Sequence, residues 1–160
     1  QGMSVAIGAA EAKKLNNDSS LVFTLHGDGE LQEGQVWEAA MYASAKKIDN
    51  LISAIDVNEK QIDGTTDDVL AMGSLRAKFE AFGWDVLDVE KGNDLDAIDE
   101  AITLAKQKTG NGKPICLLLH TEMGNGIDFM MGTHKWHGVA PNDEQLVSAL
   151  AQNEETLGDY

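Results

Sequence analysis

The sequence contains a single cysteine, Cys116, among 160 residues. One cysteine cannot form a disulfide within the chain, and it cannot supply a metal site built from several thiolates. Cys116 lies in the apolar run from Ile115 to Leu119. A thiol in such a run is typical of a buried, unreactive core residue, so we expect neither a nucleophile nor a metal ligand there.

Basic residues and long apolar runs are also scarce. Lys and Arg total 12 against 27 Asp and Glu, which gives a formal net charge of −15. A surface of this charge repels nucleic acid and anionic membranes, so neither is an expected partner. The longest apolar runs are too short to span a bilayer, and no basic segment followed by an apolar stretch opens the chain. We therefore expect a cytoplasmic protein.

The length and composition are typical of one folded domain. With 42% hydrophobic residues, 160 residues can bury one sizeable core, so residues 1–160 are predicted to form a single domain. The chain opens with Gln1 rather than methionine and enters an apparent helix at once. We expect from this that the domain is truncated at its N-terminus.

Apolar residues recur with helical and strand periodicity in alternation. Strands are predicted at 21–26, 51–56, 84–89 and 114–121, and helices at 2–16, 36–48, 68–82, 95–108 and 142–152. Strands separated by helices of this length form parallel sheets, because parallel neighbours need a long return connection. The predicted fold class is α/β, a parallel sheet with helices on both faces. The acidic stretch 85–99 is interpreted as solvated surface.

Two polar segments directly follow predicted strands. Gly27-Asp28-Gly29-Glu30 follows the first strand, and Asp56-Val57-Asn58 follows the second. Ligands of open parallel sheets bind outside the carboxyl ends of the strands, so Asp28 and Asn58 are expected to converge. Carboxylate and amide oxygens suit Mg²⁺ or Ca²⁺, with diphosphate oxygens and water completing the coordination. Each segment taken alone is also an ordinary turn sequence.

The spacing and surroundings of these segments resemble thiamine-diphosphate enzymes. Gly27-Asp28-Gly29, followed by Asn58 about thirty residues later, is similar to their signature. The segments 27–40 and 58–64 resemble transketolases, as do the opening residues 1–6 and Trp136-His137-Gly138. The resemblance implies the thiamine-diphosphate-binding fold, in its diphosphate-binding domain.

The resemblance also implies roles for individual residues. Asp28, Asn58 and the main-chain carbonyl of Lys60 are expected to hold Mg²⁺ or Ca²⁺, and Asp28, Gly29 and Asn58 to bind thiamine diphosphate. His137 matches the histidine that lies by the diphosphate and the substrate, where it can manage protons. Without the resemblance, a surface-loop histidine is the simpler interpretation of His137.

Two glutamates match a different part of the transketolase pattern. Glu33 and Glu38 resemble acidic residues near the interface between two active sites, and a catalytic role for Glu33 follows from that resemblance. The alternative is that both are ordinary acids in the first turns of a helix, where the helix dipole stabilises them.

Transfer of a two-carbon ketol unit from a ketose phosphate to an aldose phosphate is the activity that the resemblance implies. The pyrimidine-binding domain is expected from a partner subunit or from another part of the chain, in a homo- or hetero-oligomer. Three alternatives remain: a deoxyxylulose-phosphate synthase, the α subunit of a 2-oxo-acid dehydrogenase, and a non-catalytic thiamine-diphosphate-binding subunit. The 160 residues alone are expected to be inactive.

Overall fold

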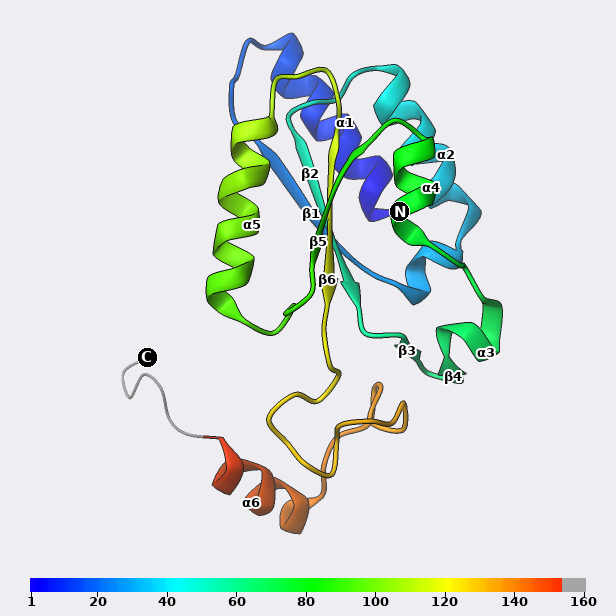
Figure 1. Ribbon diagram of the computed structural model, residues 1–160, viewed down its shortest axis with the longest axis vertical. Coiled ribbons are helices and arrows are strands. Elements are labelled where there is room, and N and C mark those ends of the chain that lie inside the picture. The colour runs from blue at the N-terminus through cyan, green and yellow to red at the C-terminus, as the bar shows by residue number, and fades with distance from the viewer. Residues whose placement is uncertain (154–160) are drawn as a thin grey trace.

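A parallel four-stranded sheet, in the order β1-β2-β6-β5, forms the centre of the computed structural model, which describes residues 1–153 (Figure 1). Its strands are β1 (Val22–Gly27), β2 (Leu51–Val57), β5 (Asp85–Val89) and β6 (Ile115–His120). The helices are α1 (Gly2–Leu15), η1 (Gly29–Gln32), α2 (Gly34–Ala45), α3 (Thr66–Leu70), α4 (Leu75–Ala81), α5 (Leu95–Lys108) and α6 (Asp143–Gln152). The predicted α/β class is confirmed, and residues 154–160 of the predicted domain lie outside the described part.

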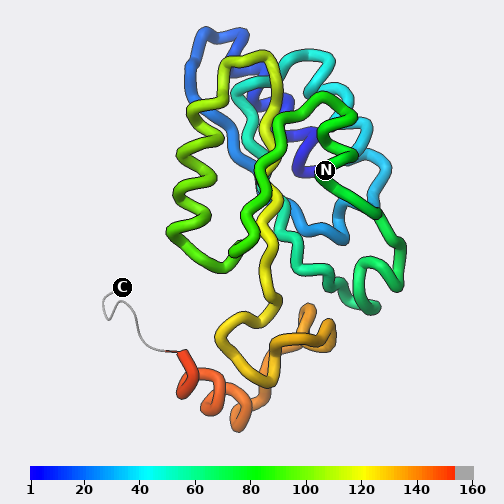
Figure 2. The backbone as a smooth tube through the Cα atoms, in the orientation of Figure 1, coloured from blue at the N-terminus to red at the C-terminus, as the bar shows by residue number. Residues whose placement is uncertain are grey.

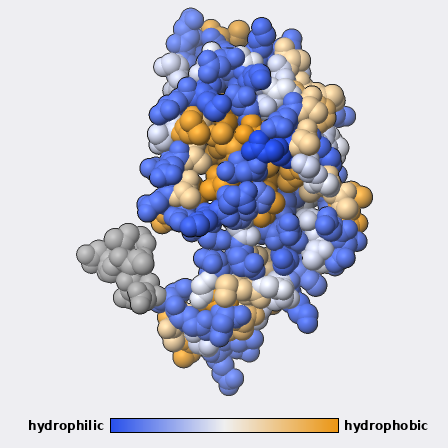
Figure 3. All heavy atoms as spheres, in the orientation of Figure 1, coloured by the Kyte–Doolittle hydropathy of each residue, from blue (hydrophilic) through white to orange (hydrophobic). Residues whose placement is uncertain are grey.

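Helices cover the two faces of the sheet unequally. The larger core packs α1, α2 and α4 against one face, around Met3, Ala40, Ile55 and Phe79. The smaller core packs α5 against the other face through Ala105. On the α5 face, Phe23 and Leu25 of the edge strand β1 stay exposed. Figure 3 shows apolar side chains gathered over the sheet beside α5.

The predicted helix 68–82 is wrong, because the structure has two short helices there. α3 ends at Leu70, and α4 begins at Leu75. Gly73 between them has φ +61°, a left-handed conformation that glycine adopts without steric cost. The Ser74 hydroxyl then accepts a hydrogen bond from the Ala77 N–H at 3.1 Å, which caps α4.

The segments beyond the carboxyl ends of β2 and β6 contribute to the site together with the turn after β1. After β2, β3 (Lys60–Gln61) and β4 (Gly64–Thr65) form a two-residue antiparallel pair that the apolar pattern did not predict. After β6, the chain runs through a long loop before α6, as Figure 2 shows. Both segments therefore lie at the sheet edge where ligands of parallel sheets bind.

Two further expectations concern burial and apolar length. Cys116 is fully buried in β6, and this burial raises the pKa of its thiol, as expected for an unreactive core cysteine. None of the helices within residues 1–153 combines the length and apolarity needed to cross a membrane.

Candidate functional site

The carboxyl ends of β1 and β2 lie side by side. The two strands pair in parallel with Gly27 opposite Asp56. The next N–H, that of Asp28, donates to the Asp56 carbonyl at 3.1 Å. This pairing brings Asp28 and Asn58 to the same point of the sheet edge, although 29 residues separate them. Their predicted convergence follows directly from strand register.

Asp28 is a buried carboxylate with 3% of its surface exposed. Its Oδ1 accepts from the Gly29 N–H at 2.7 Å, and its Oδ2 accepts from the Glu59 N–H at 2.6 Å. Burial raises the pKa of Asp28, and these backbone donors offset the effect only in part. Within residues 1–153, Asp28 has no ion pair with a basic side chain. A cation bound here therefore relieves the cost of burying this charge.

The Asn58 amide has a fixed orientation. Its Nδ2 donates to Oδ2 of Asp56 at 2.9 Å, while its Oδ1 accepts from the Lys60 N–H at 2.8 Å. A carboxylate only accepts hydrogen bonds, so the amide nitrogen must face Asp56. Asp56 is held in turn by a hydrogen bond from the Thr121 hydroxyl at the end of β6. The intervening Glu59 has φ +59°, and this left-handed turn points its N–H at Asp28.

Five of the six predicted site residues line one cavity of about 390 Å³. They are Asp28, Gly29, Asn58, Lys60 and His137. The other lining residues are Gly27, Glu30, Asp56, Gln61, Ile62 and Asp63. The cavity thus gathers acidic side chains, one lysine and one histidine at the edge of the sheet.

Gly29 and Gln61 shape one wall of this cavity. A Cβ on Gly29 would lie 3.4 Å from the Gln61 side chain, so a larger residue there would take up the space in front of Gln61. The Gln61 Oε1 is buried, and no described residue hydrogen-bonds to it. A buried acceptor left without a donor is costly, which makes Gln61 a candidate to face a bound ligand.

His137 reaches the cavity from the loop after β6, and it is exposed. Its backbone N–H donates to the His134 carbonyl at 2.9 Å. The neighbouring Trp136 anchors the loop, since its indole N–H donates to the Phe129 carbonyl at 2.8 Å and its ring packs on Phe129. A half-buried aromatic neighbour therefore fixes the backbone while the His137 side chain stays free to meet a ligand.

Glu33 is the one predicted site residue outside the cavity. It is exposed just before α2, where its carboxylate accepts from the Gln35 amide at 3.0 Å. Glu38 is exposed on the same helix. Neither residue lines the cavity that holds Asp28, so their predicted role at an interface stays a prediction.

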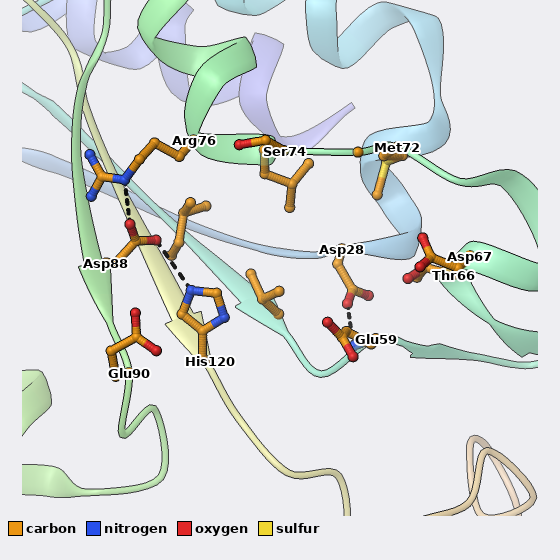
Figure 4. A pocket seen from close by; sticks show the side chains of 14 residues that line it. Asp28, Glu59, Thr66, Asp67, Met72, Ser74, Arg76, Asp88, Glu90 and His120 are labelled. Atoms are coloured by element: carbon orange, nitrogen blue, oxygen red, sulfur yellow. Dashed lines mark hydrogen bonds and ion pairs between the residues drawn. The ribbon is translucent and has the colours of Figure 1, made fainter.

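A second cavity, of about 490 Å³, shares Asp28 with the first and is also lined by Glu59 (Figure 4). On its far side Asp88 accepts from the Arg76 guanidinium and lies 3.2 Å from Nε2 of His120. The interpretation of 85–99 as solvated surface missed this arrangement. Ion pairs between distant segments leave no local sequence pattern, so only the fold brings these side chains together.

Three comparisons show which known proteins the chain is similar to. Residues 1–156 match the family model "Transketolase, thiamine diphosphate binding domain". A subunit of the apulose-4-phosphate transketolase of Phocaeicola vulgatus is 39% identical over 156 residues, which is 98% of this chain and 54% of that protein. The 6-deoxy-6-sulfo-D-fructose transketolase subunit SqwG of a Clostridium species is 38% identical, over 96% of this chain and 55% of that protein.

A solved structure gives the same result for the fold. Transketolase of Pichia stipitis, in a complex with sedoheptulose 7-phosphate, superposes with a TM-score of 0.79 and 29% identity. The superposition covers 92% of this chain and 22% of that chain. The chain spans about half the length of the two curated relatives that it matches.

Proposed function

The chain belongs to the transketolase family, and on that premise we propose that it binds the diphosphate of thiamine diphosphate together with a divalent cation. The observation that carries this proposal is the cavity in which Asp28, Gly29, Asn58, Lys60 and His137 meet. They are the residues that match the family's cofactor motifs, and they come from three separate segments of the chain.

The donor set of the cavity suits a hard cation. Asp28 supplies the charge, and the Asn58 amide oxygen and the Lys60 carbonyl supply neutral oxygens, which is the chemistry that Mg²⁺ or Ca²⁺ selects. The described residues contain no cluster of three or more His, Cys, Asp or Glu side chains of the kind that holds a metal unaided. A cation here is therefore expected to depend on diphosphate oxygens and water for its remaining ligands.

The roles of the other lining residues follow from their chemistry. Gly29 has no side chain, so a diphosphate can approach its backbone closely. His137 lies exposed at the rim, where it can donate a hydrogen bond and hold or release a proton. When bound, thiamine diphosphate supplies a nucleophilic carbon and an electron sink for breaking and making carbon–carbon bonds.

We further propose that the complete protein transfers a two-carbon ketol unit between sugar phosphates. Two relatives are described as transketolase subunits, and the superposed transketolase is described in a complex with a ketose phosphate. Because this chain spans about half of those relatives, the pyrimidine-binding half of the site is assigned to a further domain or a partner subunit.

A product assay on the complete protein with its partner subunit, thiamine diphosphate and Mg²⁺ tests this function. Xylulose 5-phosphate and ribose 5-phosphate are expected to give sedoheptulose 7-phosphate. Consumption of pyruvate with glyceraldehyde 3-phosphate would instead indicate a deoxyxylulose-phosphate synthase. Cofactor binding without turnover of any ketose phosphate would indicate a non-catalytic subunit.

A further inference from the structure

His26, directly before the Gly27-Asp28-Gly29 turn, is a fully enclosed histidine. It is 2% exposed and lies in β1 beside the start of α1, where a Cβ on Gly2 would come within 3.3 Å of the ring. Its Nε2 lies 3.0 Å from the Thr24 hydroxyl, and its Nδ1 lies 2.9 Å from Oε1 of Glu30. Both ring nitrogens are therefore satisfied, and the ring has little room to turn.

The direction of the second hydrogen bond follows from the chemistry of its partners. An ionised carboxylate only accepts, so Nδ1 of His26 donates to Glu30. The Thr24 hydroxyl can serve Nε2 either as donor or as acceptor. His26 thus ties the Glu30 carboxylate to β1 from inside the protein.

Glu30 lines the cofactor cavity, which makes its position important for an anionic ligand. The carboxylates around this cavity belong to Asp28, Glu30, Asp56 and Asp63, and its one lysine is Lys60. A divalent cation at Asp28 offsets the charge of that residue, but Glu30 belongs to no proposed ligand set. A free carboxylate beside a diphosphate repels it, and the repulsion grows as the two groups approach.

We propose that His26 is a positioning residue that holds the Glu30 carboxylate against β1 and away from the diphosphate. This inference rests on the proposed function, because it assumes that the cavity receives a diphosphate. It assigns His26 no contact with the cofactor. Its effect on affinity passes entirely through Glu30.

Calorimetric titration of thiamine diphosphate with Mg²⁺ into the complete protein and its partner subunit tests this role. In His26→Leu the Glu30 carboxylate is released, and the affinity is expected to fall about tenfold, the size of effect that repulsion between two like charges a few ångströms apart near a protein surface produces. The double variant His26→Leu/Glu30→Gln is expected to recover most of that affinity, because the released side chain is then uncharged. A purely structural role of His26 does not predict this recovery.

Three further variants test whether a loss of affinity in His26→Leu comes from the released Glu30 carboxylate. His26→Asn places an amide nitrogen near the position of Nδ1 and is expected to bind almost as tightly as the wild type. Glu30→Gln alone keeps the hydrogen bond to His26, leaves the core untouched and is expected to bind at least as tightly as the wild type. His120→Leu removes another strand-end histidine that contacts a carboxylate, outside this cavity, and is the matched control.

The proposal would be overturned by unchanged affinity in His26→Leu, or by a loss that persists in the double variant. A loss in Glu30→Gln alone would also overturn it, because Glu30 would then contribute directly to binding. If the wild-type protein does not bind thiamine diphosphate at all, the proposed function fails instead. The two failures are therefore distinguishable.

Discussion

Each edge of the sheet carries a partly or fully buried aspartate, and the two aspartates differ in whether a basic side chain pairs with the carboxylate. At the amino edge, Asp49 just before β2 accepts from the Lys14 ammonium group of α1 and, at 2.9 Å, from the Gly112 N–H. At the carboxyl edge, Asp28 accepts from the Gly29 and Glu59 N–H groups and, within residues 1–153, from no basic side chain. One carboxylate is paired with a cation of the chain, and the other is not.

The pKa shifts of the two groups differ in the same sense. Burial acts to raise the pKa of Asp49, but the hydrogen bonds from Lys14 and Gly112 outweigh it and the pKa is lowered. Burial dominates at Asp28 and raises its pKa. A carboxylate whose charge the fold already balances serves the structure, whereas one left unbalanced is suited to an external cation.

The largest expected effect comes from Asp28→Ala. It removes the only charged ligand in the proposed set, so Mg²⁺-dependent binding of thiamine diphosphate is expected to weaken at least about a hundredfold, beyond the loss from an outer-shell residue. Calorimetric titration measures this, and Asp49→Ala is the matched control that keeps wild-type affinity. Wild-type affinity in Asp28→Ala would remove Asp28 from the site.

The same Asp49→Ala variant is expected to lower stability instead. It removes the carboxylate that accepts from the Lys14 ammonium group at the end of α1 and from the Gly112 N–H in the 110–112 loop. The expected cost is about 1–2 kcal/mol in unfolding free energy. Urea unfolding of the cofactor-free protein measures this cost. An unchanged midpoint in Asp49→Ala would show that the amino edge does not depend on the pair.

Lowering the pH should change the contributions of Asp49 and Asp28 to stability in opposite directions. The lowered pKa of Asp49 contributes stability above its ordinary value of 3.8, and that contribution is lost as the pH falls. The raised pKa of Asp28 means the reverse: its contribution is most favourable below 3.8 and is lost as the pH rises through the folded-state pKa.

Urea unfolding at several pH values, with Asp49→Asn and Asp28→Asn as references, tests this sign. As the pH falls, the difference in unfolding free energy between the wild type and Asp49→Asn should shrink. Over the same range, the unfolding free energy of the wild type should rise relative to that of Asp28→Asn. Slopes of the same sign would contradict the comparison.

The smallest expected effect comes from Thr121→Val at the carboxyl edge. Valine keeps the shape but removes the hydroxyl that holds Asp56, which in turn orients the Asn58 amide. Cofactor affinity is expected to fall about threefold, with a change in unfolding free energy below about 1 kcal/mol. Calorimetry and urea unfolding on the same variant separate the two quantities, and Thr109→Val, which is remote from the site, is the control.

The sheet and the convergence of Asp28 with Asn58 were predictable, because apolar periodicity locates the strands and parallel pairing aligns their ends. The break between α3 and α4 was not, since residues 68–82 keep an apolar pattern while the backbone of residues 71–74 is not helical, with a left-handed conformation at Gly73. Local patterns therefore predicted which strand ends meet at the sheet edge, but they did not predict the conformation of the segments that connect the strands.

Contacts that depend on the folded backbone account for the rest of the missed features. His26 reads in the sequence as one more strand residue, and its contact with Glu30 depends on the turn between them. Asp88 lies in an acidic stretch, and its partners Arg76 and His120 come from other elements. Glu33, just before α2, is exposed and does not line the cavity, and its predicted role at an interface stays a prediction.

The contacts of Asp56 indicate when during folding the site forms. Its carbonyl accepts a hydrogen bond from the N–H of Asp28, just after β1, and its carboxylate accepts one from the hydroxyl of Thr121, 65 residues further along the chain. Closing such long loops is slow, so the Thr121 hydroxyl holds the Asp56 carboxylate beside Asn58 only when β6 joins the sheet. Competence to bind ligand should therefore be acquired late in refolding, after most helical structure has returned, and a nascent chain that ends before Thr121 should still lack it.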